Sequence, residues 1–445
     1  MAGRHGVNAQ GRETTDAGTS ALFLLYDLLV GATVALLLVP WELARRMAGR
    51  TGPDVLRQRL GETVPGDGTG PRILIHAVSV GEMAGAGSLA RALALRIPNA
   101  SIQLATGNRD GLAAAELLRE RQPAIRSVSL IPWDRARAMR NWVRRSRPDF
   151  VAVVETEIWP NLFRACAELS VPIAIVNGRM PPREAGRYRL AGPFFRRILD
   201  RAAWIEAQTE DDRRRFVAIG ADPARVTVGG NLKFDAAGGE TEPDEGDRDE
   251  GLVVGGSTHP PEERLLLEVF GTLRAGNPSM RLALAPRRIA RARSVARQAR
   301  ARGFRTARGS EGTGAWDVLV VDRIGGLAPL YARAGIAVVG GTFADRGGQS
   351  PLEAARSACA IVAGPSRGNF AEVFAGLEGA GAVESTDGDR LGACLASLLA
   401  DRERRRELGR RAREFSLSGR GAAARCADRI ASSIAATTTE RDGAR

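Results

Sequence analysis

The chain has 445 residues, 44% hydrophobic and 26% charged, which is long enough for two globular domains and too apolar for wholesale disorder. Its net charge of +13 favours an anionic membrane surface or anionic substrates. Nucleic acid is a poor candidate, because aromatic residues make up only 5% and no nucleic-acid-binding motif occurs. The four cysteines and three histidines are scattered, which predicts reduced thiols and no metal site.

The first predicted element is an apolar helix at residues 21–39, ALFLLYDLLVGATVALLLV. Its length is close to the ~20 residues that cross a bilayer, and Asp27 is its only charge. Arginines follow the segment more densely than they precede it, which predicts that the bulk of the protein is cytoplasmic. No small-residue cleavage site follows, so we predict an uncleaved single-pass anchor rather than a signal peptide, with an interfacial helix as the alternative.

From residue 72 onward, short runs rich in Val and Ile alternate with helical stretches rich in Ala and Arg. This alternation is typical of βαβ units and a parallel sheet. The first set of strands is ILIHAVSV, SIQLAT, SVSLIP, FVAVVE, VPIAIVN, WIEAQ and RVTVGG. After an acidic, glycine-rich stretch the alternation restarts with GLVVGGS, MRLALAP, DVLVVD, GIAVVGG and CAIVAG.

We therefore predict an α/β protein with two doubly wound, Rossmann-like domains that face a cleft at the carboxyl ends of their strands. The expected organisation is a tail with the anchor helix at 1–50, a first domain at 51–235, an acidic linker at 236–251, a second domain at 252–430 and a polar tail at 431–445.

Polar residues follow several of the predicted strands. Glu82 begins a helix after ILIHAVSV, where a carboxylate either complements the helix dipole or carries chemistry. Lys233 is the only lysine in a chain rich in arginine, which favours a site that needs a compact ammonium group. GGSTH and GGTFADRGG resemble turns whose backbone amides bind an anion. Further polar strand ends are Glu155, Glu157, Asn161, Asn231, Asp235, Ser257, Thr258, His259, Arg287 and Glu353.

Seven segments, in order along the chain, closely resemble the motifs of the 3-deoxy-D-manno-octulosonic acid (Kdo) transferases. They are ILIHAVSVGE, VVETEIWPNL, GNLKFD, GSTHPPEE, APR, GGTFADRGGQSPLE and the GP…NF of residues 364–370. The resemblance runs from the anchor to about residue 375. It implies a GT-B fold and an inverting glycosyltransferase of lipopolysaccharide biosynthesis. Such an enzyme moves Kdo from CMP-Kdo to a phosphorylated lipid A precursor at the inner membrane, without a cofactor.

The resemblance also assigns roles to residues. Glu82 corresponds to the general base, and Glu155 and Lys233 to the groups that stabilise the transition state. The CMP contacts correspond to Pro286, Arg287, Ile324, Gly325, Gly326, Ser350, Pro351, Leu352 and Glu353.

The chain departs from the family pattern at four donor-site positions. Arg288, Gly326, Gln349 and Ser350 stand where the family usually has His, Glu, His and Asn. These departures motivate an alternative hypothesis. In it, the enzyme transfers another CMP-activated acidic sugar or uses another lipid acceptor. A third hypothesis is a catalytically inactive, membrane-tethered nucleotide sensor. The number of Kdo units transferred does not follow from these motifs.

Overall fold

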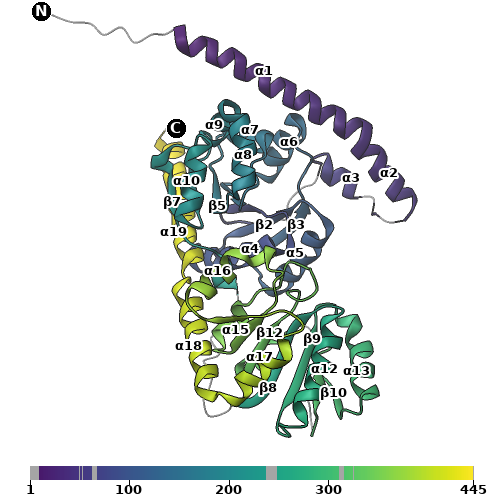
Figure 1. Cartoon of the computed structure of the whole chain (residues 1–445). Helices are drawn as coiled ribbons and strands as arrows, with labels where there is room; N and C mark the ends of the chain where they lie inside the picture. Colours follow the sequence, from purple (N-terminus) through teal and green to yellow (C-terminus); the bar gives the residue numbers. More distant parts are fainter. Residues whose placement is uncertain are drawn as a thin grey trace, which may run out of the picture. The chain divides into compact units, whose positions relative to one another are not determined.

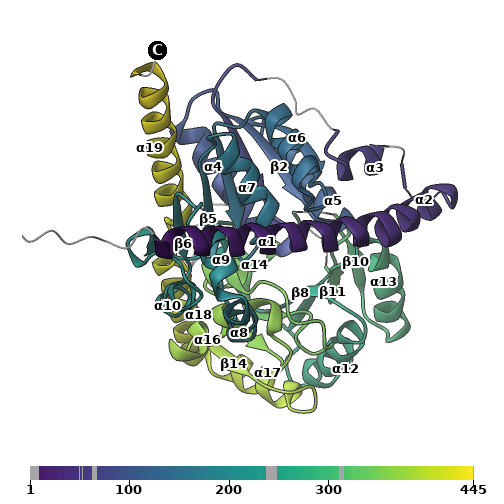
Figure 2. The ribbon, with the colours of Figure 1, turned by 90° about the horizontal axis from the view of Figure 1, so that it is seen from above.

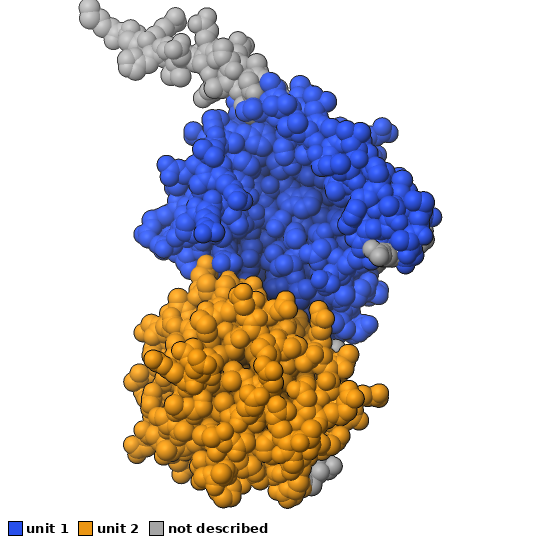
Figure 3. Space-filling model, turned by 45° about the vertical axis from the view of Figure 1, so that its right-hand side comes forward, with its two compact units in different colours: residues 1–236, 420–445 blue, residues 237–419 orange. Residues whose placement is uncertain are grey.

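Two seven-stranded parallel sheets organise the chain, each in its own unit. The computed structural model describes residues 10–49, 51–52, 54–62, 68–236, 248–309, 315–323 and 325–443. Unit 1 comprises residues 1–236 and 420–445, and unit 2 comprises residues 237–419 (Figure 3). The predicted α/β class with two Rossmann-like domains is confirmed.

The sheet of unit 1 has the strand order β3-β2-β1-β4-β5-β6-β7, and the chain reverses direction across the sheet between β1 and β4. Every neighbouring pair is parallel. The strands are β1 (Arg72–His76), β2 (Ser101–Thr106), β3 (Ile125–Leu130), β4 (Phe150–Val154), β5 (Ile173–Gly178), β6 (Trp204–Ala207) and β7 (Val226–Val228). All seven were expected from the sequence.

Helices cover both faces of this sheet (Figure 1). Successive side chains of a strand point to opposite faces, so Leu74 joins the core beneath α6, α7 and α9, while Ile73 and Ile75 join the core beneath α4, α5 and α19. The helices are α1 (Gln10–Thr33), the π-helical turn η1 (Val34–Leu38), α2 (Val39–Met47), α3 (Asp54–Arg59), α4 (Val80–Arg96), α5 (Arg109–Arg121), α6 (Ala136–Ser146), α7 (Pro160–Glu168), α8 (Pro182–Leu190), α9 (Gly192–Leu199), α10 (Glu210–Ala218), η2 (Pro223–Arg225), α11 (Lys233–Ala236) and α19 (Ala422–Gly443).

The C-terminal helix α19 belongs to unit 1, so the structure differs from the expected boundary at residue 430 and from the expected polar tail at 431–445. Cys426 and Ile430 are buried in the core on the α4 side of the sheet. Trp204 donates a hydrogen bond to Ser433 over 3.1 Å. The helix therefore covers a sheet face that would otherwise be open.

Unit 2 repeats the architecture with the order β10-β11-β9-β8-β12-β13-β14. Its strands are β8 (Asp249–Thr258), β9 (Arg281–Pro286), β10 (Thr306–Arg308), β11 (Val318–Val320), β12 (Ala334–Val339), β13 (Ala360–Ala363) and β14 (Val383–Ser385). Its helices are α12 (Glu262–Arg274), η4 (Ile289–Arg291), α13 (Ala292–Ala301), α14 (Ala328–Arg333), α15 (Leu352–Arg356), η5 (Gly368–Phe370), α16 (Ala371–Gly379), α17 (Leu391–Ala400) and α18 (Arg402–Ser418).

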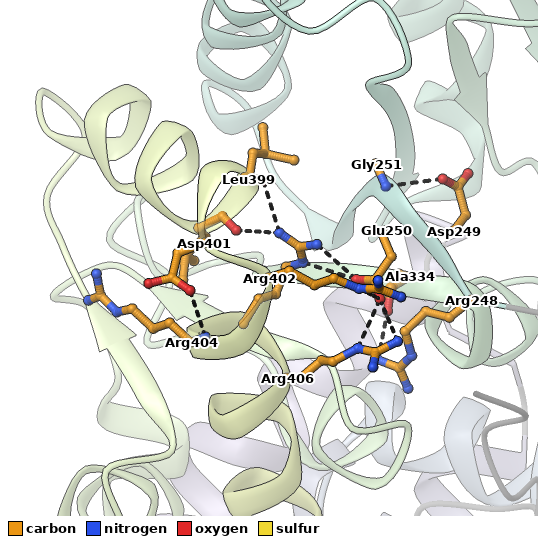
Figure 4. A network of polar contacts seen from close by, with 12 residues as sticks. Arg248, Asp249, Glu250, Gly251, Ala334, Leu399, Asp401, Arg402, Arg404 and Arg406 are labelled. Carbon is orange, nitrogen blue, oxygen red and sulfur yellow. Dashed lines mark hydrogen bonds and ion pairs between the residues drawn. The ribbon is translucent and has the colours of Figure 1, made fainter. Parts of the chain in front are cut away.

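The end of the expected linker forms part of β8. Most of that linker, residues 237–247, lies outside the described residues. Glu250 accepts hydrogen bonds from Arg402 and Arg405 of α18, over 3.1 and 2.8 Å (Figure 4). Arg248 donates to the carbonyl oxygens of Ala334 and Ala358, over 3.1 and 2.7 Å. Arg248 and Glu250, at the end of this stretch, therefore fix the first strand of unit 2 to β12 and α18.

The helix Ala21–Met47, which runs from α1 into α2, is long and apolar enough to cross a membrane by length and composition, with a mean hydropathy of 2.4 over an 18-residue stretch. It lies across one end of unit 1, over α7 and α9 (Figures 1 and 2). Its face toward the unit includes Phe23 and Val34, both buried. The predicted N-terminal apolar helix is present.

Candidate active site

The carboxyl ends of β1 and β4 lie side by side at the point where the strand order of unit 1 reverses. In open parallel sheets, ligands bind at such a switch point. Glu82 stands in the first turn of α4, after β1, and Glu155 follows β4 directly. The topology therefore brings to one edge of the sheet two glutamates to which the resemblance assigns catalytic roles.

Glu82 has a structural role as well as a position at this site. Ser79 is the N-cap of α4, and its hydroxyl accepts from the Glu82 amide over 3.2 Å. Glu82 Oε2 in turn accepts from the Val78 amide over 2.7 Å, an arrangement close to a capping box. Among the described residues, Oε1 makes no comparable hydrogen bond. One oxygen closes the helix, and the other is available to accept a proton.

Glu155 and Lys233 form an ion pair. Lys233 Nζ lies 2.8 Å from Glu155 Oε1, and each side chain is only 12% exposed. Glu155 adopts a left-handed backbone with φ of 62°, a conformation that costs a non-glycine residue about 1–3 kcal/mol and clusters at functional sites. The only lysine of the chain is thus held beside the glutamate that ends β4.

The charges of this pair act on Glu82. Burial raises the pKa of Glu82 above its usual value, the Glu155 charge raises it further, and Lys233 opposes the shift. Burial also raises the pKa of Glu157 to about 7, with Glu82 and Glu155 adding to the effect. Glu157 accepts a hydrogen bond from Trp159 Nε1 over 2.6 Å. The sequence marks Glu157 only as a polar residue after a strand, although the E-x-E spacing it forms with Glu155 is a signal for a second carboxylate at the site.

The other polar residues of these motifs are structural. Asn161 donates through its side chain to the Asp134 carbonyl over 2.7 Å, beneath α1. Asn231 Oδ1 accepts from the Lys233 amide over 2.9 Å. Asp235 accepts from the amides of Gly421 and Ala423, over 2.9 and 2.8 Å, at the start of α19. In the segment GNLKFD, Lys233 pairs with Glu155, whereas Asn231 and Asp235 bind backbone amides.

In unit 2, the expected anion-binding turns are occupied by a carboxylate of the chain itself. Glu262 accepts from the amides of His259 and Gly341, both over 2.8 Å, and of Phe343 over 2.9 Å. Glu262 thereby ties the loop after β8 to the loop after β12. These three amides are not presented to a phosphate, so the expectation for them is wrong, and the two loops are instead fixed to each other.

The loop 340–349 is also fixed from the segment 364–370. Asn369 donates to the carbonyl oxygens of Arg346 and Gly348, over 2.9 and 3.2 Å. Gly347 has φ of +73°, and a Cβ there would lie 2.7 Å from the Asn369 side chain. Glycine is therefore required for this close approach.

The surroundings of His259 are cationic. Burial lowers the pKa of His259, and the charges of Arg346, Arg287 and Arg288 lower it further, with Glu263 opposing them. Gln349 Nε2 lies 3.2 Å from His259 Nε2, so a residue that departs from the family pattern contacts a family motif. The cluster has the charge that a phosphate or carboxylate ligand requires.

The remaining predicted CMP contacts all belong to unit 2. Pro286 ends β9 and is buried, whereas Arg287 is exposed and donates its amide to Thr258 over 2.9 Å. Ser350 is exposed, Glu353 in α15 is half-buried, and burial raises the pKa of Glu353. Gly325 has φ of +84°. Ile324 lies outside the described residues, and Gly326, Pro351 and Leu352 are buried.

Residues 54–236 match a family model described as 3-deoxy-D-manno-octulosonic-acid transferase (kdotransferase). Over 409 residues the chain is 31% identical to the 3-deoxy-D-manno-octulosonic acid transferase of Bordetella pertussis, covering 88% of this chain and 94% of the relative. The chain belongs to the Kdo transferase family. The Haemophilus influenzae enzyme of the same name is 30% identical over 376 residues, covering 80% and 86%.

Solved structures share the fold of this Kdo transferase family member. A UDP-GlcNAc 2-epimerase from Neisseria meningitidis has a TM-score of 0.51 at 9% identity and covers 78% of this chain and 98% of its own. MurG from Acinetobacter baumannii has a TM-score of 0.51 at 12% identity and covers 81% and 99%. The expected GT-B fold is thereby confirmed.

Proposed function

We propose that this protein transfers Kdo from CMP-Kdo to a phosphorylated lipid A precursor, with inversion at the anomeric carbon. The observation that carries the proposal is the meeting of Glu82, Glu155 and Lys233 at the switch point of unit 1. Membership of the Kdo transferase family supports the sugar and the place in lipopolysaccharide biosynthesis. The basic chain and its apolar helix support a site at the cytoplasmic face of the inner membrane.

In the proposed reaction, Glu82 Oε1 accepts the proton of an acceptor hydroxyl as its oxygen attacks the anomeric carbon of Kdo. The bond from that carbon to the phosphate oxygen of CMP breaks, and the electron pair leaves with CMP. Lys233, held by Glu155, stabilises the negative charge that develops on the departing phosphate. Glu82 is half-buried and carries a raised pKa, so its carboxylate is more basic than one in water.

The CMP moiety is proposed to bind unit 2, at the contacts named from the family pattern. Arg287 supplies positive charge there, and Glu353 accepts hydrogen bonds from the ribose hydroxyls. We propose no resident cofactor or metal, because a monophosphate leaving group can be neutralised by cationic side chains. Transfer is therefore expected to persist in excess EDTA, and its loss there with recovery on adding Mg²⁺ would contradict this part of the proposal.

The test is transfer from CMP-Kdo to a tetraacylated lipid A precursor by the detergent-solubilised full-length chain and its Glu82→Gln variant. Glutamine keeps an oxygen for the Val78 amide and loses the basicity. Transfer is expected to fall by about 10²–10⁴-fold at unchanged thermal stability. Ser79→Ala is the matched control, since it removes the N-cap at a cost of about 1 kcal/mol and leaves the carboxylate. Equal activity of Glu82→Gln and wild type would refute the base assignment.

A different CMP-activated acidic sugar, or a different lipid acceptor, is the second candidate. It is favoured by the donor-site departures, among them Gln349 beside His259. Turnover of CMP-Kdo with the lipid A precursor at rates typical of glycosyltransferases would exclude it. Binding of CMP without transfer of Kdo would favour it.

A further inference from the structure

The apolar N-terminal helix is docked on unit 1 along almost its whole length. Phe23, Val34 and Glu42 are buried against the unit, and Tyr26 and Asp27 are half-buried. From Phe23, the half-buried pair follows after three and four residues, Val34 after seven more and Glu42 after a further eight, so the positions are one or two turns apart, as expected for one face of a helix. From Phe23 to Glu42 the helix rises by about 28 Å, which is close to the ~30 Å thickness of a hydrocarbon core.

Polar contacts hold this helix in place. Tyr26 donates to Asp134 Oδ2 over 2.8 Å. Asp27 Oδ1 accepts from the Ala136 amide over 2.9 Å and from the Asn161 side chain over 3.2 Å. Asp27 therefore serves the first amide of α6, which has no cap from its own N-cap residue. The one charge in the apolar segment is a docking group, and releasing the helix would leave the α6 amide without its partner.

The opposite face of the helix is a row of exposed apolar side chains. They are Leu22, Leu24, Leu25, Leu28, Leu29, Leu36, Leu37, Trp41, Leu43 and Met47. A continuous exposed apolar surface of this kind marks an interaction site. Because the docked face lies against unit 1 over the same length, this apolar row runs along the surface of the unit and does not project from it.

Arginines accompany the helix along its length. Arg201 lies over the Phe23 ring, with 4.9 Å from the guanidinium to the centroid, and Arg45 lies over Trp41 at 4.4 Å. The Arg135 guanidinium would lie 3.8 Å from a Cβ placed on Gly31. If the helix crossed a bilayer, Gly31 would lie near the centre of the hydrocarbon core. Arg135 would then lie there too, and burying its charge in hydrocarbon costs several kcal/mol (about 3 or more). In a helix that lies flat, all three arginines are at the level of lipid phosphates.

We propose that residues 21–47 form an in-plane membrane helix, with the leucine row inserted into one leaflet of an anionic phospholipid bilayer and unit 1 lying on its surface. This replaces the single crossing expected from the sequence. It also has a consequence that rests on the proposed function. Asn161, which Asp27 contacts, lies six residues after Glu155, so the docked helix sets the height of the catalytic carboxylates above the lipid surface.

Insertion depth tests the proposal without requiring transferase activity. Spin labels are placed one at a time on the apolar row of the full-length chain, in vesicles of phosphatidylethanolamine and phosphatidylglycerol. The background carries Cys394→Ser, because the other three cysteines are buried. Label sites seven residues apart on one face are Leu22, Leu29, Leu36 and Leu43, and a label at exposed Leu95 of α4 is the control outside the membrane.

Power saturation is expected to give one shallow depth, about 5–10 Å, at all four positions, and no insertion at Leu95. A crossing helix would instead give shallow ends and a deep middle, with Leu29 and Leu36 about 10 Å further in than Leu22 and Leu43. That profile would overturn the proposal. Strong dipolar broadening between identical labels would overturn it too, because the row would then be covered by a second copy of the chain.

Asp27→Leu tests the positioning role, with Leu28→Ala on the exposed face as the matched control. Asp27→Leu is expected to lose the uniform depth and to slow transfer to the lipid acceptor by about tenfold or more, with CMP binding unchanged. Leu28→Ala is expected to keep both. Uniform depth and full transfer in Asp27→Leu would refute the positioning role. A uniform depth in wild type alongside absent Kdo transfer would refute only the proposed function.

Discussion

Replacing Lys233 by methionine removes one charge of the buried pair at the proposed active site and keeps much of the side-chain volume. Nζ and the Glu155 carboxylate oxygen are 2.8 Å apart, and both side chains are 12% exposed. Two unit charges at that distance attract by about 6 kcal/mol at an effective dielectric constant of about 20. Removing one partner of such a pair costs about 3–5 kcal/mol, so the melting temperature of unit 1 is expected to fall by roughly 10 °C.

Calorimetry, CMP titration and a transfer assay on the same preparation separate stability from chemistry. Lys233→Met is expected to slow transfer by about 10²–10³-fold and to leave CMP affinity nearly unchanged. The double variant Lys233→Met with Glu155→Gln is expected to regain much of the stability and to stay inactive, because no unpaired charge remains. A double variant as unstable as Lys233→Met would refute the coupling. An equal fall in CMP affinity and rate would make Lys233 a ground-state phosphate contact.

Three further predictions concern charge, capping and backbone shape. Since the base acts when ionised and the pKa of Glu82 is raised, kcat/KM should begin to fall with decreasing pH above the range of an ordinary glutamate. Glu155→Gln removes the nearby anion that raises this pKa and should move that limb to lower pH, and an unmoved limb would contradict the proximity. Asp235→Ala should cost about 1–2 kcal/mol and speed hydrogen exchange in residues 422–439, whereas Asp428→Ala at an exposed ion pair should change stability by less than about 0.5 kcal/mol. Gly347→Ala should weaken CMP binding in a titration, because φ is +73° and the added methyl meets the neighbouring loop.

The main features of the fold and the heart of the candidate site could be predicted from the sequence because parallel strands impose strong local rules. Val- and Ile-rich runs are buried on both faces of a sheet, so they stand out from the helices between them. Carboxyl ends of adjacent strands share one edge, which is why Glu82 and Glu155 could be expected together. Lys233 was singled out by composition, and the structure places it on Glu155.

The features that escaped prediction depend on contacts between segments far apart in the chain. Strands β10 (TAR) and β14 (VES) lie at the two edges of their sheet and are only half-buried, so they lack the run of Val and Ile that marks the inner strands. Nothing in the alanine-rich sequence of α19 indicates which unit the helix joins. Asp235 of unit 1 fixes its start by accepting from the Gly421 and Ala423 amides. Glycine-rich turns resemble anion sites wherever they occur, and only the fold reveals that Glu262 already occupies the amides. A polar residue after a strand can be a catalyst or a cap, and sequence alone does not separate the two.

The segment ETEIWPN contains a proposed catalytic residue and, a few residues later, the start of a helix that another segment caps. Glu155 turns the chain at the end of β4 with a left-handed backbone, and α7 begins five residues later. Asp134 accepts from the first amides of α7 and from Tyr26 of the apolar helix. In the proposed reaction the acceptor hydroxyl belongs to a lipid and approaches from the bilayer surface. A base held at a fixed height above that surface would meet it more often than one on a flexible tether. Tyr26 and Asp27 would be unfavourable in a helix surrounded by lipid. In a helix docked on unit 1 they are favourable, because they hydrogen-bond to Asp134 and to the Ala136 amide.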